Sequence, residues 1–338
     1  MTPMTKRETV RAIKGKGLPV VICGAGIVGK ALLAVCEEEG IAVDCFCDSS
    51  AKVAGTEFCG KRVVHTPELG RRYKDAVQLI SVAAIADVVS LLEAGGFFNW
   101  YAGGLLLEGA DTSQSAAGAP IDYPRFAVEN CILCHRGYLN PGKLFLRSVD
   151  LMITERCSLR CRDCSNLMQY YEKPKNCDLG DLLRYIDAFF SVVDEVMDFR
   201  LIGGDVFMNR EWPALVRRLA GESRARRVVL YTNGTLVPDD EDLRCLRAPG
   251  CLVIVTDYGP LSRRLPLLLQ ALARNKIAHH VLKPGEWLDC AAIAPHGRGP
   301  AGNRELFRAC CAKNMPTLSE GRIYRCPYAA NAARLSAV

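Results

Sequence analysis

The stretch Cys157-Ser-Leu-Arg-Cys161-Arg-Asp-Cys164 determines how this chain is interpreted, and it closely follows the apolar run Val149-Asp-Leu-Met-Ile-Thr154. The run predicts a β-strand, so the three thiols, in C-x3-C-x2-C spacing, are expected in the loop at its carboxyl end. A [4Fe–4S] cluster is normally held by four cysteine thiolates. Three cysteines therefore predict a cluster with one iron left for a ligand that is not protein. The alternatives are a zinc site, which needs a fourth ligand, and incidental buried thiols.

Residues 144–288 alternate between predicted strands and helices. Apolar runs predict strands at 148–154, 198–202, 227–231, 252–255 and 279–282, with amphipathic helices between them. This alternation is typical of a parallel α/β sheet, here a partial (β/α)6 barrel. Polar clusters follow the second, third and fourth of these strands, at the ends where parallel α/β folds have their sites. They are Gly203-Gly204-Asp205, Thr232-Asn233 and Thr256-Asp257.

The cysteine loop and the downstream glycine turn together resemble the radical S-adenosylmethionine (radical SAM) superfamily, over about residues 145–285. The resemblance implies that Cys157, Cys161 and Cys164 ligate a [4Fe–4S] cluster. S-adenosylmethionine (SAM) would chelate its open iron through amino and carboxylate groups. The implied SAM contacts are Gly203, Gly204 and Asp205 at the methionine amino group, Thr232 and Asn233 at the ribose or carboxylate, and Thr256 and Asp257 at a more variable position.

The resemblance also implies an activity. Members of the superfamily cleave SAM reductively, with an electron donor such as flavodoxin or ferredoxin, and the resulting 5′-deoxyadenosyl radical abstracts a substrate hydrogen atom. Two residues depart from the family pattern. Asp205 replaces the commoner Glu, and Asp163 stands where many relatives have an aromatic residue that packs on adenine. Tyr170 or Tyr171 is expected to fill that space.

Residues 1–108 predict a separate α/β domain, a Rossmann-like parallel sheet. Strands are expected at 18–23, 41–47, 62–64, 76–82 and 97–101, and helices at 30–40 and 86–94. The first strand leads into Gly24-Ala-Gly26-Ile-Val-Gly29, and the second ends at Asp48. In such a G-x-G-x-x-G pattern the first glycine permits a tight turn and the second lets a pyrophosphate approach. The third allows close helix packing, and the acidic residue binds a ribose.

This pattern predicts a site for a nucleotide, a nucleotide sugar or NAD(P). The domain resembles the Rossmann-like modules found beside sugar-modifying transferases. The alternative is that the glycines only permit tight packing. Dehydrogenase chemistry is not favoured, because this half contains no evident catalytic acid–base set.

Residues 109–143 are expected to be a linker, since they begin with a run of small and polar residues without periodicity. They end with Cys131-Ile-Leu-Cys134-His135, which invites a zinc or redox interpretation. No second C-x2-C lies at zinc-ribbon spacing, so ordinary buried thiols are favoured over a second metal site. Five further cysteines are expected to fill the core of the first domain: Cys23, Cys36, Cys45, Cys47 and Cys59.

The tail, residues 289–338, predicts a short β-hairpin around Ser319-Glu-Gly321. Cysteines on both sides of it resemble the auxiliary-cluster regions called SPASM or twitch domains. Candidate ligands of one auxiliary iron–sulfur cluster are Cys290, Cys310, Cys311 and Cys326. The alternative is a hairpin with free thiols that merely closes the barrel.

Composition limits the class of protein. The 338 residues are 49% hydrophobic and 24% charged, which is ordinary for a globular protein of two domains. The net charge of +6 comes from mixed charges, so no nucleic-acid partner is expected. No signal peptide is evident. No apolar run is long enough to span a membrane, so no membrane span is expected. With 17 cysteines and no export signal, reduced thiols, metal ligation and a cytoplasmic location are expected.

Three functional hypotheses follow. The first is a radical SAM oxidoreductase or carbohydrate-modifying enzyme, whose small-molecule substrate is a nucleotide-linked sugar or a polysaccharide precursor. The second is a peptide-modifying maturase, although residues 1–140 show no peptide-binding winged helix. The third is a non-catalytic nucleotide-binding protein whose iron–sulfur cluster is structural or senses redox state.

Overall fold

The computed structural model of the protein describes residues 4–70, 73–110, 123–285 and 289–337. The chain divides into two compact units, Met1–Lys143 and Leu144–Val338. The predicted linker is therefore wrong for its second part. Residues 123–138 form helix α4 (Tyr123–Tyr138), which packs on the first unit, and residues 111–122 lie outside the described chain. The tail belongs to the same unit as the predicted barrel.

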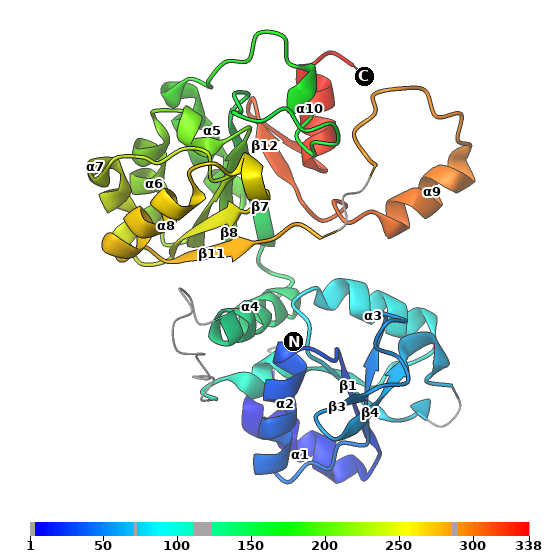
Figure 1. The fold of residues 1–338 in the computed structure, drawn as a ribbon. Helices are drawn as coiled ribbons and strands as arrows, with labels where there is room; N and C mark the ends of the chain where they lie inside the picture. Colours follow the sequence, from blue (N-terminus) through cyan, green and yellow to red (C-terminus); the bar gives the residue numbers. More distant parts are fainter. Residues whose placement is uncertain (1–3, 71–72, 111–122, 286–288, 338) are drawn as a thin grey trace. The chain divides into compact units, whose positions relative to one another are not determined.

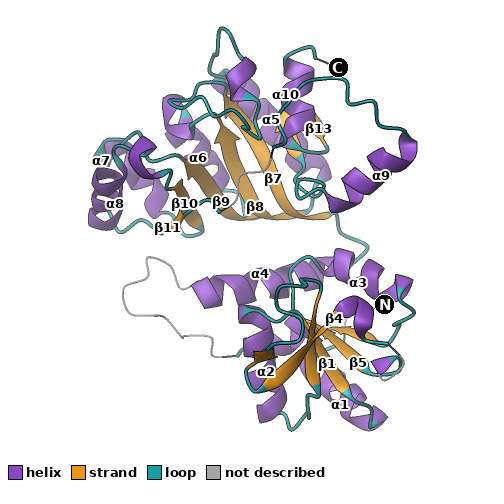
Figure 2. Cartoon of the chain, turned by 45° about the vertical axis from the view of Figure 1, so that its right-hand side comes forward, coloured by secondary structure: helices purple, strands orange, loops and turns teal. Residues whose placement is uncertain are grey.

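The first unit is an α/β sheet with helices on both faces (Figure 2). Its strand order is β3-β4-β2-β1-β5-β6, and all neighbouring strands are parallel except β3 and β4. The strands are β1 (Val20–Cys23), β2 (Cys45–Asp48), β3 (Glu57–Phe58), β4 (Lys61–His65), β5 (Val77–Ile80) and β6 (Trp100–Ala102). The other helices are α1 (Lys6–Lys16), α2 (Ile27–Glu38) and α3 (Ile85–Ala94).

Alternation along the central strand separates two hydrophobic cores in this unit. Ile22 of β1 packs with residues of α1, α2 and α4, whereas its neighbours Val21 and Cys23 pack with residues of α3. Helix α1 was not predicted from the sequence. Its beginning is nevertheless encoded locally, because Thr5 and Glu8 form a reciprocal capping box.

The second unit is built on a sheet of order β11-β10-β9-β8-β7-β12-β13 (Figures 1 and 2). Strands β7 to β11 follow one another in parallel and are joined by helices, as predicted. The strands are β7 (Phe145–Thr154), β8 (Glu195–Gly203), β9 (Ala225–Thr232), β10 (Cys251–Thr256), β11 (His279–Leu282), β12 (Thr317–Ser319) and β13 (Arg322–Tyr324). The helices are α5 (Leu179–Val192), α6 (Trp212–Ala220), α7 (Asp240–Leu243), α8 (Leu265–Arg274), α9 (Pro300–Ala309) and α10 (Pro327–Arg334).

The tail supplies the sixth parallel strand of this sheet. Strand β12 pairs in parallel with β7, and β13 turns back antiparallel to β12 through the predicted hairpin. The sheet therefore gains its sixth parallel strand beside β7, not beyond β11 as a regular (β/α)6 succession would have it.

The helices α5, α6 and α8 cover one face of this sheet and leave the other face for a site. On β7, Val149, Leu151 and Ile153 pack into the hydrophobic core beneath these helices. Because side chains alternate along a strand, Asp150 and Met152 point to the opposite face. Within the described residues, no helix has the length and apolar character needed to span a membrane.

Candidate cofactor-binding cavity

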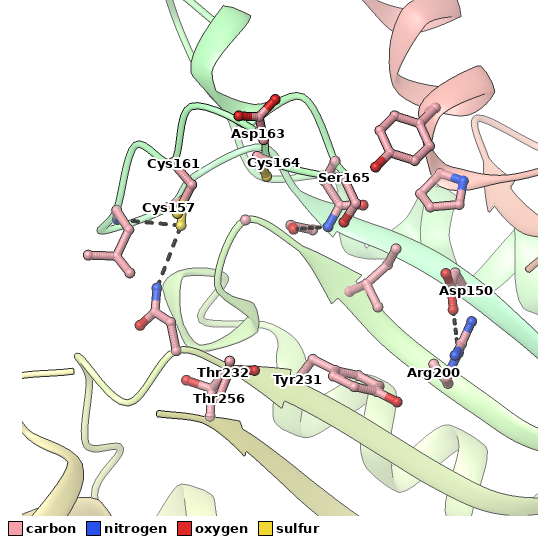
Figure 3. A pocket seen from close by; sticks show the side chains of 18 of the residues that line it. Asp150, Cys157, Cys161, Asp163, Cys164, Ser165, Arg200, Tyr231, Thr232 and Thr256 are labelled. Atoms are coloured by element: carbon pink, nitrogen blue, oxygen red, sulfur yellow. Dashed lines mark hydrogen bonds and ion pairs between the residues drawn. The ribbon is translucent and has the colours of Figure 1, made fainter. Parts of the chain in front are cut away.

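A cavity of about 490 Å³ lies on the open face of the second unit, at the carboxyl ends of β7, β8, β9 and β10. Its volume is within the range typical of ligand sites. Figure 3 shows the cysteine loop at one end of the cavity and Asp150 with Arg200 at the other. The predicted residues that line it are Cys157, Cys161, Cys164, Gly203, Gly204, Thr232, Asn233, Thr256 and Cys290.

The loop after β7 brings all three predicted cluster cysteines to this cavity. Two nitrogen donors approach the sulfur of Cys157: the Asn233 side-chain amide at 3.6 Å and the Leu159 backbone N–H at 3.4 Å (Figure 3). Burial raises the pKa of the Cys157 thiol to about 11. A metal must therefore displace a tightly held proton, which is the usual coupling between thiolate ligation and protonation.

The arrangement of the cysteines distinguishes this loop from a site that holds a single metal ion. Among the residues that the structure describes, no three His, Cys, Asp or Glu side chains form a group able to hold one metal ion. Ligands of one zinc ion must converge on that ion, whereas the cysteines of a cluster bind different iron atoms. Three thiols that line one cavity therefore fit a cluster better than zinc.

The turn after β8 lets the backbone form a wall of the cavity. A Cβ atom on Gly203 would lie 2.2 Å from the Thr154 carbonyl oxygen, and one on Gly204 would lie 2.0 Å from the carbonyl oxygen of Arg156. Gly203 also has φ of +153°, where L side chains are disfavoured. Glycine is thus needed at both positions, because the turn packs directly on the start of the cysteine loop. The Gly203 carbonyl accepts a hydrogen bond from the Asn166 side-chain amide at 2.7 Å.

Asp205 was predicted to contact the SAM ammonium group, but the structure places its side chain elsewhere. Its side chain is fully buried and does not line the cavity. It accepts hydrogen bonds from the Thr232 hydroxyl at 2.9 Å and the Asn233 and Phe207 backbone N–H groups at 2.9 and 3.1 Å. Burial raises its pKa, and these hydrogen bonds oppose the rise. Asp205 therefore joins the ends of β8 and β9.

The aromatic residues of the cavity also differ from the prediction. Neither Tyr170 nor Tyr171 lines it, and their hydroxyls donate to the Ala291 carbonyl and the Asn331 side chain. Tyr258, from the end of β10, and Tyr328, from α10, line it instead. Burial raises the pKa of Tyr258 to about 12.

The predicted contact at Asp257 is replaced by its neighbour. Asp257 does not line the cavity, and its carboxylate accepts a hydrogen bond from the Gly259 N–H at 2.8 Å. Thr256 and Tyr258, on either side of it, do line the cavity. Alternation of side chains at the end of β10 explains the difference.

Asp163, which departs from the family pattern, has a structural role. Its carboxylate accepts hydrogen bonds from the backbone N–H groups of Cys290 and Ala291 at 3.2 and 3.4 Å. It also pairs with Arg162 at 2.8 Å, and this bond lowers its pKa. The residue therefore ties the cysteine loop to the segment that precedes α9.

The tail brings some of the predicted auxiliary ligands near the cavity. The exposed thiol of Cys290 lies 2.8 Å from the Tyr328 hydroxyl. Burial raises the pKa of Tyr328, and Cys290 and Cys311 raise it further. Cys326 is the N-cap residue of α10, and Cys310 follows α9 as its C-cap.

In the first unit, the glycine turn and Asp48 lie together as predicted. Gly24 has φ of +116°, and a Cβ atom on Gly29 would lie 2.1 Å from the Gly24 carbonyl oxygen. These two glycines therefore serve the turn and the close packing. A Cβ atom on Gly26 would meet nothing within 4 Å. The Asp48 carboxylate accepts hydrogen bonds from the Ala25 and Ser50 N–H groups at 3.0 and 2.8 Å.

The remaining cysteines of this unit are mostly core residues. Cys131, Cys134 and His135 are buried on α4, and His135 accepts from the Gly104 N–H at 3.0 Å while its Nε2 lies 2.9 Å from the Val82 carbonyl. Four of the five predicted core cysteines are buried. Cys59 is the exception, because it is exposed in the turn between β3 and β4 with φ of +51°.

The second unit contains a polar group that was not predicted from the sequence. Asp150 of β7, Arg200 of β8 and Tyr231 of β9 all line the cavity. A signal was present, because a charged residue inside an apolar strand run is informative. It could not be interpreted without the register that makes Asp150 and Arg200 direct cross-strand neighbours.

Comparison with known families supports the chemistry suggested by this geometry. The model of the Radical SAM superfamily matches residues 151–256, which include the cysteine loop, the glycine turn and the ends of β9 and β10.

Curated relatives share this part of the chain. A GTP 3′,8-cyclase of Geobacter sulfurreducens is 31% identical over 93 residues, which are 26% of this chain and 27% of that protein. A GTP 3′,8-cyclase of Xanthomonas axonopodis pv. citri is 30% identical over 97 residues, which are 27% of this chain and 28% of that protein. The chain thus spans little more than a quarter of the length of these relatives.

Among solved structures, BtrN in complex with AdoMet and 2-DOIA has a TM-score of 0.40 and 16% sequence identity to this chain. The superposition covers 55% of this chain and 75% of BtrN.

Proposed function

We propose that this chain, whose residues 151–256 form a radical SAM domain, is an enzyme that uses SAM and a [4Fe–4S] cluster to abstract a hydrogen atom from a small molecule. One observation carries the proposal. Cys157, Cys161 and Cys164 share one cavity with the Gly203–Gly204 turn, at the carboxyl ends of neighbouring parallel strands. Ligand sites in parallel α/β folds lie at these ends.

The residues present fit the implied cofactors. The three cysteines would hold the cluster, and the Asn233 amide and Leu159 N–H would donate to the Cys157 sulfur. Gly203, Gly204, Thr232, Asn233 and Thr256 would bind SAM, with Asp205 fixing the position of Thr232 and Asn233. When bound together, cluster and SAM supply a 5′-deoxyadenosyl radical.

The test is anaerobic. Protein reconstituted with iron and sulfide is incubated with SAM and dithionite, and 5′-deoxyadenosine is measured. The wild type is expected to form it, and Cys161→Ala to form none. Cys177→Ala is a matched control, because Cys177 is a half-buried cysteine of the same unit that does not line the cavity. Equal product from wild type and Cys161→Ala would refute the proposal.

The substrate proposal is a nucleotide-linked sugar or a polysaccharide precursor, with the nucleotide held by the first unit. Its support is the turn at Gly24, Gly26 and Gly29, which lies between β1 and the beginning of α2 with Asp48 hydrogen-bonded to it. Backbone N–H groups at the beginning of a helix favour phosphate. Equilibrium dialysis of radiolabelled UDP-glucose against the full chain tests this. Absence of saturable binding by UDP-glucose, GDP-mannose and dTDP-glucose would overturn it.

Two further parts of the proposal concern electron transfer. The electron donor is a flavodoxin or ferredoxin, as in the family, and dithionite replaces it in the assay. Cys290, Cys310, Cys311 and Cys326 are proposed to bind one auxiliary cluster, supported by Cys290, whose exposed thiol lines the cavity 2.8 Å from the Tyr328 hydroxyl. Iron and sulfide contents of about eight per chain support a second cluster of four irons, and about four exclude it.

A further inference from the structure

The deepest part of the cavity contains a charged pair that the cofactor residues do not use. Asp150 and Arg200 are cross-strand neighbours on β7 and β8, and the Arg200 Nε lies 2.5 Å from the Asp150 carboxylate. They precede Thr154 and Gly203, at the strand ends, by three or four residues. At about 3.3 Å per residue they lie roughly 10–13 Å along the strands from these carboxyl ends.

This pair is enclosed but incompletely hydrogen-bonded. The side chains of Asp150 and Arg200 are 2% and 14% exposed. The Arg200 Nη2 is buried and has no hydrogen-bond partner among the described residues, although the Tyr231 hydroxyl interacts with the same guanidinium. The Tyr231 ring centroid lies 5.9 Å from the Arg200 guanidinium carbon. Burying a donor without an acceptor is unfavourable, so an oxygen atom from a ligand is favoured at this position.

The charges indicate what kind of oxygen atom this is. Asp150 already neutralises Arg200, so an anionic group would meet the Asp150 carboxylate beside the guanidinium. Like charges held close together disfavour each other strongly where water is excluded. A hydroxyl group has no charge and can accept from Arg200 while it donates to Asp150.

We propose that Asp150, Arg200 and Tyr231 form a subsite for the uncharged hydroxyl groups of a sugar or cyclic polyol. The inference rests on the proposed function, because it names the part of the substrate that reaches the floor of the cavity. Adjacent hydroxyls of a ring use the donor and the acceptor together, and the Tyr231 ring packs against the apolar part of the ligand.

The same sheet supplies a matched control pair. Asp198 of β8 and Arg227 of β9 form an ion pair of 2.8 Å on the same sheet, but neither residue lines the cavity. Substitution of this pair disturbs a partly buried Asp–Arg contact and leaves every residue that lines the cavity unchanged.

The experiment is equilibrium dialysis with the full chain, reconstituted with its cluster and loaded with SAM, in the absence of a reductant. The probes are radiolabelled D-glucose, D-galactose, N-acetyl-D-glucosamine and myo-inositol, with inorganic phosphate and acetate as anionic probes. At least one uncharged probe is expected to bind, and Asp150→Asn and Arg200→Met are each expected to weaken it by about tenfold or more, as for hydrogen bonds to charged groups. Asp198→Asn is expected to change binding by less than twofold.

The proposal is overturned if no uncharged probe binds, or if binding is unaffected by both substitutions. It is also overturned if phosphate or acetate binds and Asp150→Asn tightens that binding, because the subsite would then serve an anion. Cluster content and thermal unfolding are measured for each variant. If Arg200→Met does not fold, Arg200→Lys keeps the charge while losing the guanidinium fork and is expected to weaken binding similarly. A wild type that forms 5′-deoxyadenosine but binds no sugar refutes only this inference, whereas one that forms none refutes the proposed function.

Discussion

The two units each contain a glycine turn with an aspartate beside it in space, and the turns differ in what they face. In the second unit Gly203 and Gly204 line the cavity, and their missing Cβ atoms make room for the backbone of the cysteine loop. In the first unit Gly24 and Gly29 make room only for the unit's own strands and helices, whereas Gly26 has open space around it. A glycine pattern therefore has two possible causes, packing or ligand access, and each position must be assigned separately.

The aspartates of the two turns show the same distinction in burial. Asp205 is fully buried and accepts hydrogen bonds from Thr232, Asn233 and Phe207. Asp48 is half-buried and accepts from two backbone N–H groups. Asp205 thus holds two strand ends of a cavity together, and Asp48 stabilises a local turn. Substitutions at matched positions test this difference.

The largest effect is expected for Gly204→Ala. The new Cβ atom would lie 2.0 Å from the Arg156 carbonyl oxygen and 2.8 Å from the Cys157 Cβ atom, so the cysteine loop must move. We expect loss of the cluster, measured by iron content, and a loss of 5′-deoxyadenosine formation of about a hundredfold, equivalent to about 3 kcal/mol. A variant with wild-type iron content and activity would show that the turn does not position the loop.

The second largest effect is expected from substitution of the two aspartates. Asp205→Asn puts an amide N–H₂ among donors that need acceptors, so the free energy of unfolding is expected to fall by about 1–3 kcal/mol. Asp48→Asn is expected to lower it by about 1 kcal/mol or less, because water reaches this turn. Both changes in the free energy of unfolding are measured on the full chain by urea denaturation. Hydrogen exchange, detected in proteolytic fragments that come from each unit, reports the two units separately. Equal losses would contradict the difference in burial.

The two units are also expected to respond oppositely to acid. In the first unit burial lowers the pKa of His135 to about 4, and hydrogen bonds to the backbone of Val82 and Ala102 oppose this shift. The unfolded chain binds this proton near pH 6.5 and the folded chain does not. Stability is therefore lost as the pH falls below 6.5, by about 2 kcal/mol between pH 7 and 5.

In the second unit burial raises the pKa of Asp150 to about 6, and Arg200 opposes the rise. The folded state then binds a proton more tightly than the unfolded state. Asp150 contributes stability below about pH 4, and this stability is lost as the pH rises through 6. The gain between pH 7 and 5 is about 1 kcal/mol. The free energy of unfolding of each unit is measured at pH 5 and 7 by the same exchange experiment. His135→Gln should abolish the pH dependence of the first unit, and Asp150→Asn should abolish that of the second. Dependences that persist in both variants would contradict the assignment.

Local patterns were sufficient to predict much of this molecule. The cysteine loop, the glycine turn after β8 and the hairpin around Gly321 each depend on neighbouring residues only, and all are present. The partners of Asp205 and the pairing of Asp150 with Arg200 depend on strand register, which no single stretch contains. For the same reason Asp257 was predicted at the cavity although alternation turns it away. Helix α4 was not predicted, because the linker inferred from the small and polar residues before it was extended to residue 143.

The smallest effect on stability is expected for Gly26→Ala, which is the sharpest test of the first turn. A Cβ atom at this position meets nothing within 4 Å, and the backbone has φ of −137°, which alanine adopts without strain. The free energy of unfolding should change by less than about 1 kcal/mol. If the turn binds a pyrophosphate, the added methyl group occupies the space through which it approaches, and dialysis of UDP-glucose against the full chain should show weaker binding. Wild-type affinity in this variant would place the nucleotide elsewhere, and Gly24 and Gly29 would then be explained by packing alone.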